Sequence, residues 1–258
     1  MTLTNLPTKM ISKKILTFFL GTMIVSAVLA PILILAENND NNQGGKAFCQ
    51  KISESSAKWV ERVLERETKI EAKREEINGK IEERWTKQDQ RLLEKREKWD
   101  ENRTDHFAKL EEKAKTDAQK QALVVFKEAA SGAITARRAA INAALEAFRQ
   151  GVQQAKLSRQ LEIDAAKLTF KNAVTAAFET AKTNCASGTS LATVRQNLKD
   201  ALIAAKEKYR SDYQEIETLQ AAIDQQIESR RTAIEKAIQD FKLAMEKARN
   251  DFKAATGQ

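Results

Sequence analysis

The amino-acid sequence predicts an all-α protein, an elongated antiparallel helical bundle or coiled coil that follows a hydrophobic N-terminal segment. Three observations support this class. An eleven-residue repeat runs along most of the 258 residues, both prolines, Pro7 and Pro31, lie near the start, and 31% of residues are charged against 6% aromatic. Such a composition is typical of long helices and coiled coils. No stretch shows the sustained alternation of a strand.

The eleven-residue repeat predicts long, straight helices that pack side by side. Eleven residues make nearly three helical turns, so a side chain repeated at this step stays on one helix face. Alanines in the repeat permit a neighbouring helix to approach closely. The repeated positions are Phe48, Trp59, Ile70, Ile81 and Leu92; Ala122, Ala133, Ala144, Ala155, Ala166 and Ala177; Ile141, Val152, Ile163, Val174 and Cys185; and Ile216, Ile227 and Ile238.

The N-terminal 36 residues resemble an export signal. We expect them to lie outside the helical bundle. A cationic segment, residues 1–14, precedes 22 residues without charge, 15–36. A cleaved signal peptide usually has a shorter apolar core, whereas a spanning helix needs about 20 residues. The length favours a retained membrane anchor, with a cleaved signal peptide as the alternative. Lys13 and Lys14 keep the N-terminus inside, which places the body outside the cytoplasm.

The remaining chain divides into a spacer and three periodic segments. Residues 37–47 are polar and glycine-containing, which is typical of a flexible linker. Residues 48–117 are highly charged, with basic and acidic residues in equal number, residues 118–185 are alanine-rich, and residues 191–256 form a third periodic segment. Turn-forming residues at 186–190 separate the last two: Gly188 suits a left-handed position, and Ser190 can cap the next helix.

The position of the first turn stays open between residues 102–105 and residues 116–117. Asp117 lies 68 positions after Cys49 and 68 positions before Cys185. This equality favours three helices of similar length, folded up, down and up. The alternative is a long hairpin, in which one helix runs from about 50 to 183 and only the last helix folds back.

The two cysteines are predicted to form a disulfide. An even cysteine count in an exported chain favours a bridge. The three-helix arrangement brings Cys49 and Cys185 to the same end of the bundle, within the Cα separation that a disulfide allows. The alternative is two isolated thiols.

Few residues in the sequence suggest catalysis. The single histidine, His106, lies beside Asp105 without the other ligands that a metal site requires. Adjacent carboxylates such as Glu82 and Glu83 diverge around a helix, and Gly44-Gly45 is a linker pair and not a phosphate loop. We therefore expect no enzyme activity, cofactor, metal or small-molecule substrate.

A basic stripe on the middle segment is the one candidate binding surface. It consists of Arg137, Arg138, Arg149, Arg159 and Lys167. Export argues against nucleic acid, so an anionic lipid or an anionic envelope polymer is the expected target. The alternative is a set of arginines whose stems pack against neighbouring helices. Trp59, Trp85 and Trp99 occupy stripe positions and are expected to pack in the core and not to stack on a ligand.

Together these features predict an exported, membrane-anchored, non-enzymatic coiled-coil protein that acts as a spacer, scaffold or interaction rod at the cell envelope. Its expected partners are the membrane, through residues 15–36, and either a second copy or another envelope protein. The alternatives are a holdase-like helical chaperone and a protein that binds anionic lipid or envelope polymer. The narrow apolar stripe and the matched charges favour packing against helices over packing against lipid.

Overall fold

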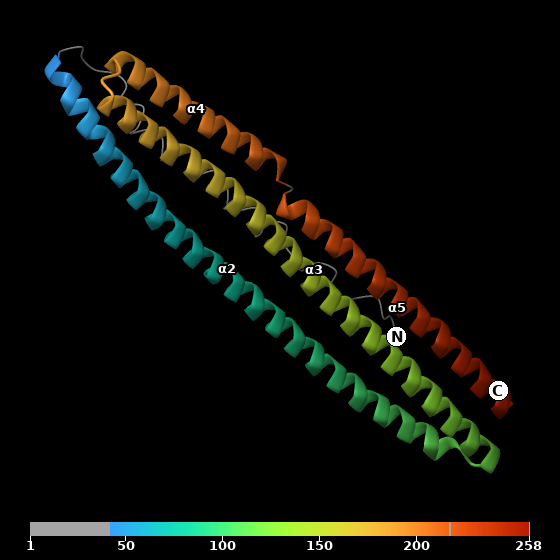
Figure 1. Cartoon of the computed structure of the whole chain (residues 1–258). Helices are drawn as coiled ribbons and strands as arrows, with labels where there is room; N and C mark the ends of the chain where they lie inside the picture. The colour runs from blue at the N-terminus through green and yellow to red at the C-terminus, as the bar shows by residue number, and fades with distance from the viewer. Residues whose placement is uncertain (1–41, 217, 258) are drawn as a thin grey trace. The chain divides into compact units, whose positions relative to one another are not determined.

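The computed structural model describes residues 42–216 and 218–257, and these residues are almost entirely helical (Figure 1). Their helices are α2 (Asn42–Lys113), α3 (Asp117–Ala186), α4 (Leu191–Glu215) and α5 (Leu219–Thr256). The described residues contain no strand, which confirms the all-α class. The expected cationic segment 1–14 and apolar segment 15–36 lie outside the described residues.

The first turn lies at residues 114–116, so the long-hairpin alternative is wrong. Thr116 and Gln119 form a capping box at the start of α3. The Gln119 amide donates to Thr116 Oγ1 at 3.2 Å, and Gln119 Oε1 accepts from the amides of Thr116 (3.2 Å) and Lys115 (2.9 Å). These contacts satisfy amides that the first turn of a helix leaves unpaired.

The second turn follows the prediction for residues 186–190. Gly188 adopts a positive φ of 78°, and the Thr189 amide donates to the Asn184 carbonyl at 3.1 Å. This is the pattern of a left-handed helix end that satisfies the last carbonyls. Ser190 then caps α4, because its side chain accepts from the Thr193 amide at 3.2 Å.

Two expected boundaries need correction. Helix α2 begins at Asn42, so the predicted linker 37–47 is helical over its second half. Once residues from Phe48 onward are helical, the helix extends without a new nucleation step, and the hydrogen bond gained per residue offsets the ordering cost of Gly44 and Gly45.

The third periodic segment, expected as one helix over 191–256, is two helices. Ile216 closes α4 in an extended conformation (φ −68°, ψ 122°), and the Thr218 carbonyl accepts from the Ala221 amide at 3.0 Å. Thr218 Oγ1 also lies 3.4 Å from this amide, as expected of a threonine that caps a helix. The apolar spacing continues through the break, which is why periodicity alone does not reveal it.

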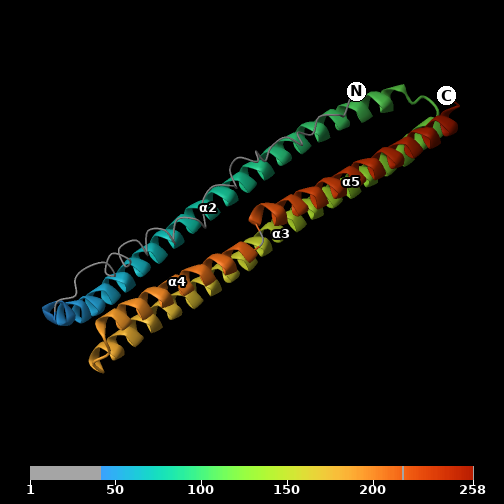
Figure 2. The ribbon, with the colours of Figure 1, turned by 90° about the horizontal axis from the view of Figure 1, so that it is seen from above.

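The chain folds into two compact units. Unit 1 comprises the described residues up to Glu71 together with Ala155–Ala222, and unit 2 comprises Ala72–Gln154 together with the residues from Ile223 onward. Within unit 1, the early part of α2 lies beside the end of α3 and beside α4. Within unit 2, the later part of α2 lies beside the beginning of α3, and α5 runs along α3 (Figure 2).

Unit 1 contains a continuous apolar core. All three of its long helices contribute to it, and the side chains of Ile52, Val174, Phe178 and Val194 are fully buried. Burial of each such side chain contributes about 1.5–3 kcal/mol. The cluster consists of Phe48, Ile52, Trp59, Ala166, Phe170, Val174, Ala177, Phe178, Ala181, Val194, Leu198, Leu202, Ala205 and Tyr209.

The buried residues of unit 2 come from α3 and α5. Among the described residues, the part of α2 in unit 2 contributes only partly buried side chains. The buried residues are Ala122, Leu123, Ala130, Ala144, Phe148, Val152, Ile223, Ala237 and Ala248. Helix α2 is therefore held in this unit by a different set of contacts.

Candidate functional site

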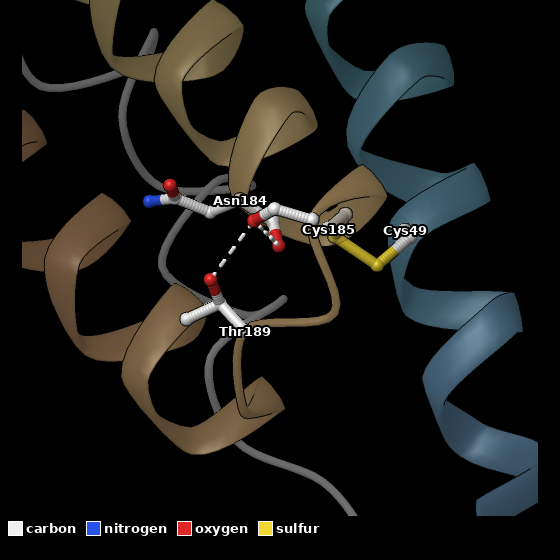
Figure 3. Close-up of a disulfide and its surroundings, with 5 residues drawn as sticks. Cys49, Asn184, Cys185 and Thr189 are labelled. Carbon is white, nitrogen blue, oxygen red and sulfur yellow. Dashed lines mark hydrogen bonds between the residues drawn. A yellow bond between two sulfur atoms is a disulfide. The ribbon is translucent and has the colours of Figure 1, made fainter.

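The disulfide lies at the end of unit 1 where α2 begins and α3 ends (Figure 3). The structure joins Cys49 to Cys185, the pair expected from the sequence, with their Cα atoms 6.0 Å apart. This separation is within the usual range for a disulfide. Both cysteines are partly buried and pack against the apolar core of the unit. The bond therefore fixes the beginning of α2 to the helix end that precedes α4.

The five residues of the predicted basic stripe are all partly buried and contact neighbouring side chains. In unit 1, Arg159 donates to Tyr213 Oη at 3.2 Å, and Lys167 pairs with Asp164 at 3.2 Å. The Arg159 guanidinium also lies 5.8 Å from the centre of the Tyr213 ring. Arg159 therefore contacts α4, in agreement with the stem-packed alternative, whereas Asp164, the partner of Lys167, lies on the same helix.

In unit 2, Arg138 and Arg149 each form a two-pronged ion pair with an aspartate of α2. Arg138 Nη1 lies 3.0 Å from Asp100 Oδ2, and Arg149 Nη1 lies 2.8 Å from Asp89 Oδ2. The hydrogen bond from Arg138 is the main cause of the lowered pKa of Asp100, and Arg103 adds to it. The hydrogen bond with Asp89 likewise raises the pKa of Arg149. The arginines of α3 thus bind α2 to the bundle.

These ion pairs form a ladder with the same eleven-residue step as the apolar stripe. A third pair, Lys127 with Glu111, continues it toward the first turn. The acids at 89, 100 and 111 are each eleven apart, and so are the bases at 149, 138 and 127. Along two antiparallel helices, one residue number rises as its partner's number falls, so the two numbers of each pair have a constant sum. Here that sum is 238. We name these three pairs the charge ladder.

The acidic half of the charge ladder is absent from the sequence-based candidates. Asp89 and Asp100 lie on a helix so rich in charge that single carboxylates there resemble solvated residues. One sequence signal could have revealed these pairs. The acids of one segment and the bases of the other repeat at the same eleven-residue step, and the two segments are predicted to be antiparallel. The same eleven-residue step also relates a pair in unit 1, where Lys171 pairs with Glu67 at 3.6 Å. The residue numbers of this pair again sum to 238.

The three tryptophans have different environments. Trp59 is buried in unit 1, 6.4 Å from the ring of Phe178, as expected of a core residue. Trp85 is partly buried beneath the Arg149 guanidinium, whereas Trp99 is 40% exposed beside Arg137. The expectation of core packing therefore holds for Trp59, and Trp99 presents an aromatic surface to solvent.

The described residues contain neither a cluster of metal ligands nor a helix that could span a membrane. His106 is exposed, and no group of three or more potential ligands lies together in the described ranges. Within residues 42–257, apart from position 217, no helix is both long and apolar enough to cross a bilayer.

Comparison with known proteins gives no relative. No protein-family model, no curated protein sequence and no solved structure matches this chain.

Proposed function

We propose that this chain is a non-enzymatic spacer or scaffold of the cell envelope. Residues 15–36 anchor it in the membrane, and the helical body lies outside the cytoplasm. The main support for the proposal is that the long helices pack against one another along their length. Helix α3 has 70 residues, and a rise of about 1.5 Å per residue gives it a contour length of roughly 100 Å.

The apolar stripe supports the proposal because it is used for packing between helices. Among the described residues, every buried side chain is apolar or aromatic. Four of the six alanines of the eleven-residue repeat, Ala122, Ala144, Ala166 and Ala177, are buried, and the other two are partly buried. Small side chains at these positions permit close helix contacts, and a lipid-facing stripe has no such requirement.

The disulfide supports the proposed compartment. Structural disulfides persist in oxidising surroundings such as the periplasm or the cell exterior and are rare in the cytosol. The bond between Cys49 and Cys185 therefore agrees with export of the body.

Energy transfer from a labelled helix end to the membrane tests the spacer. Lys115→Cys and Ser187→Cys variants of the full chain are labelled with a donor dye, with the native disulfide intact, and placed in vesicles that carry an acceptor lipid. A spacer that stands away from the bilayer predicts strong transfer from position 187 and weak transfer from position 115. Equal transfer from both labels would instead indicate that the body lies along the lipid surface.

A holdase-like chaperone is the second candidate, and exposed leucines on α3 favour it. Leu157, Leu161 and Leu168 occupy one helix face in unit 1, and Leu161 is 71% exposed. Contiguous exposed apolar side chains are a feature of surfaces that bind other proteins. A chaperone predicts suppression of thermal aggregation of a model client, lost when these three leucines become serine. The matched control replaces Leu93 and Leu243, which are exposed on other helices.

A further inference from the structure

Four arginines lie close together in unit 2, and two of them pair with the same carboxylate. Arg96 and Arg103 belong to α2, and Arg137 and Arg138 belong to α3. Asp100 accepts from both Arg103 (2.8 Å) and Arg138 (3.0 Å), so a single negative charge is shared by two guanidinium groups. These four arginines and Asp100 together carry a net charge of +3, and the nearby Asp89 is already paired with Arg149.

The other two arginines are in direct contact with uncharged groups, and the charges of Asp100 and Asp89 act on Arg96 only at longer range. Arg96 Nη2 donates to the side-chain carbonyl of Asn142 at 2.8 Å. The Arg137 guanidinium lies 4.1 Å from the centre of the Phe241 ring and 5.7 Å from that of Trp99. Arg138 Nη2 also lies 3.5 Å from the backbone carbonyl of Arg96, which holds the cluster together. Within the described residues, no carboxylate forms an ion pair with Arg96 or Arg137.

The excess charge has an energetic cost that the neighbouring rings offset only in part. Burial is the main cause of the lowered pKa of Arg137, and the charges of Arg138 and Arg96 lower it further. Stacking on aromatic rings stabilises a cation by about 0.5–2 kcal/mol, but it does not reduce the repulsion among three guanidinium groups. Partly buried charges are normally paired, so a counter-ion from outside the chain is the expected complement.

We propose that Arg96, Arg137 and Arg138 form a binding site for a phosphate group, with the exposed face of Trp99 at its edge. Guanidinium groups present pairs of N–H donors that match phosphate oxygens. The remaining sequence-predicted basic residues do not belong to this site: Arg149 is neutralised by Asp89, and Arg159 and Lys167 belong to the other unit. The inference is independent of the spacer proposal, because a spacer needs no ligand at this position.

The test measures binding of inorganic phosphate to the full chain by calorimetry at constant ionic strength, with chloride as the reference anion. We expect saturable binding that Arg96→Gln and Arg137→Gln each weaken roughly 10- to 100-fold, because each removes a charge-assisted contact. Arg149→Gln is the matched control for Arg137→Gln, since it removes the same charge from the same helix at a position that already has an acid. It should leave phosphate binding unchanged.

Asp100→Asn should change the phosphate affinity in the opposite direction to the two arginine variants. It removes the shared carboxylate, so phosphate should bind several-fold more tightly, which a folding defect does not produce. Circular dichroism confirms that each variant remains helical. Absence of phosphate binding, equal losses in Arg137→Gln and Arg149→Gln, or weaker binding in a helical Asp100→Asn variant would each overturn the proposal.

Competition identifies the source of the phosphate group. A soluble poly(glycerol phosphate) and vesicles of phosphatidylglycerol carry the same phosphodiester. The two probes are compared at equal concentrations of phosphate groups. Stronger displacement by poly(glycerol phosphate) indicates a polymer ligand, and stronger displacement by the vesicles indicates a lipid ligand. Displacement by neither indicates a small free phosphate. The Arg137→Gln variant must reduce whichever competition is observed, and competition that is unaffected would contradict the assignment to this site.

Discussion

Helix α2 is held in unit 1 by a buried apolar core, and in unit 2 by ion pairs together with partly buried apolar and aromatic side chains. In unit 1 it buries Phe48, Ile52 and Trp59 and is covalently linked to α3. In unit 2 its seam positions include Asp89 and Asp100, and it contributes no fully buried side chain among those described. The same eleven-residue period thus builds two interfaces of different strength, because burial of a large apolar side chain contributes more than a solvent-exposed ion pair.

Removal of the disulfide should have the largest effect on stability, and the local loss of protection should be greatest in unit 1. The bond joins residues 136 positions apart, for which the loop-entropy estimate is about 4–5 kcal/mol. The Cys49→Ser, Cys185→Ser double variant should show faster hydrogen exchange in α4 and in the first turns of α2. Equal loss of protection over residues 72–113 would contradict the contrast between the units.

Truncation of one isoleucine in each unit compares the two interfaces directly. Ile52 is 0% exposed, whereas Ile81, on the same helix, is only partly buried. Ile52→Ala should lower the free energy of unfolding by about 3 kcal/mol because it leaves a cavity, and Ile81→Ala by about 1 kcal/mol. Urea denaturation of the two variants measures the difference, and equal losses would indicate that unit 2 is packed as tightly as unit 1.

Enlarging an alanine of the repeat tests how closely the helices of unit 1 approach each other. Ala166 is buried, whereas its neighbour Ala165 is exposed on the same helix. Ala166→Leu should lower stability by about 1–3 kcal/mol through overpacking, whereas Ala165→Leu should be nearly neutral. Thermal melting distinguishes them. If both variants melt like the parent chain, the alanine stripe is not a close-packed seam.

Acidification should weaken unit 2 through Asp100, by the smallest amount of the four predictions. The pKa of this carboxyl is lowered in the folded chain, so its contribution is present above its unfolded pKa, about 3.9, and is lost as the pH falls through the folded value. Asp100 is more than one third exposed, so solvent screening keeps the contribution below about 1 kcal/mol. Asp100→Asn should reduce the drop in melting temperature between pH 6 and pH 3, whereas Asp105→Asn, at an exposed position of the same helix, should not.

The sequence predicts the helices well because apolar side chains at three- and four-residue spacing determine which faces pack. The turn at Gly188 was also predictable, since glycine is favoured at a positive φ. The break after Ile216 was not, because the apolar spacing continues through it and a lone Thr218 resembles any helical threonine. The partners of Arg138 and Arg149 were missed for a related reason: a carboxylate on a highly charged helix looks solvated until its antiparallel neighbour is known.

The charge ladder has the same translational symmetry as the apolar stripe, and this symmetry leaves the helix register weakly defined. If α2 slid along α3 by eleven positions, Asp89 would face Arg138 and Asp100 would face Lys127, so two of the three acids would again meet a base, and only Glu111 would lose its partner. Apolar side chains would meet apolar side chains in the same way. Only features that occur once can distinguish these registers. In unit 2 that feature is the capping turn formed by Thr116 and Gln119, and in unit 1 it is the bond between Cys49 and Cys185.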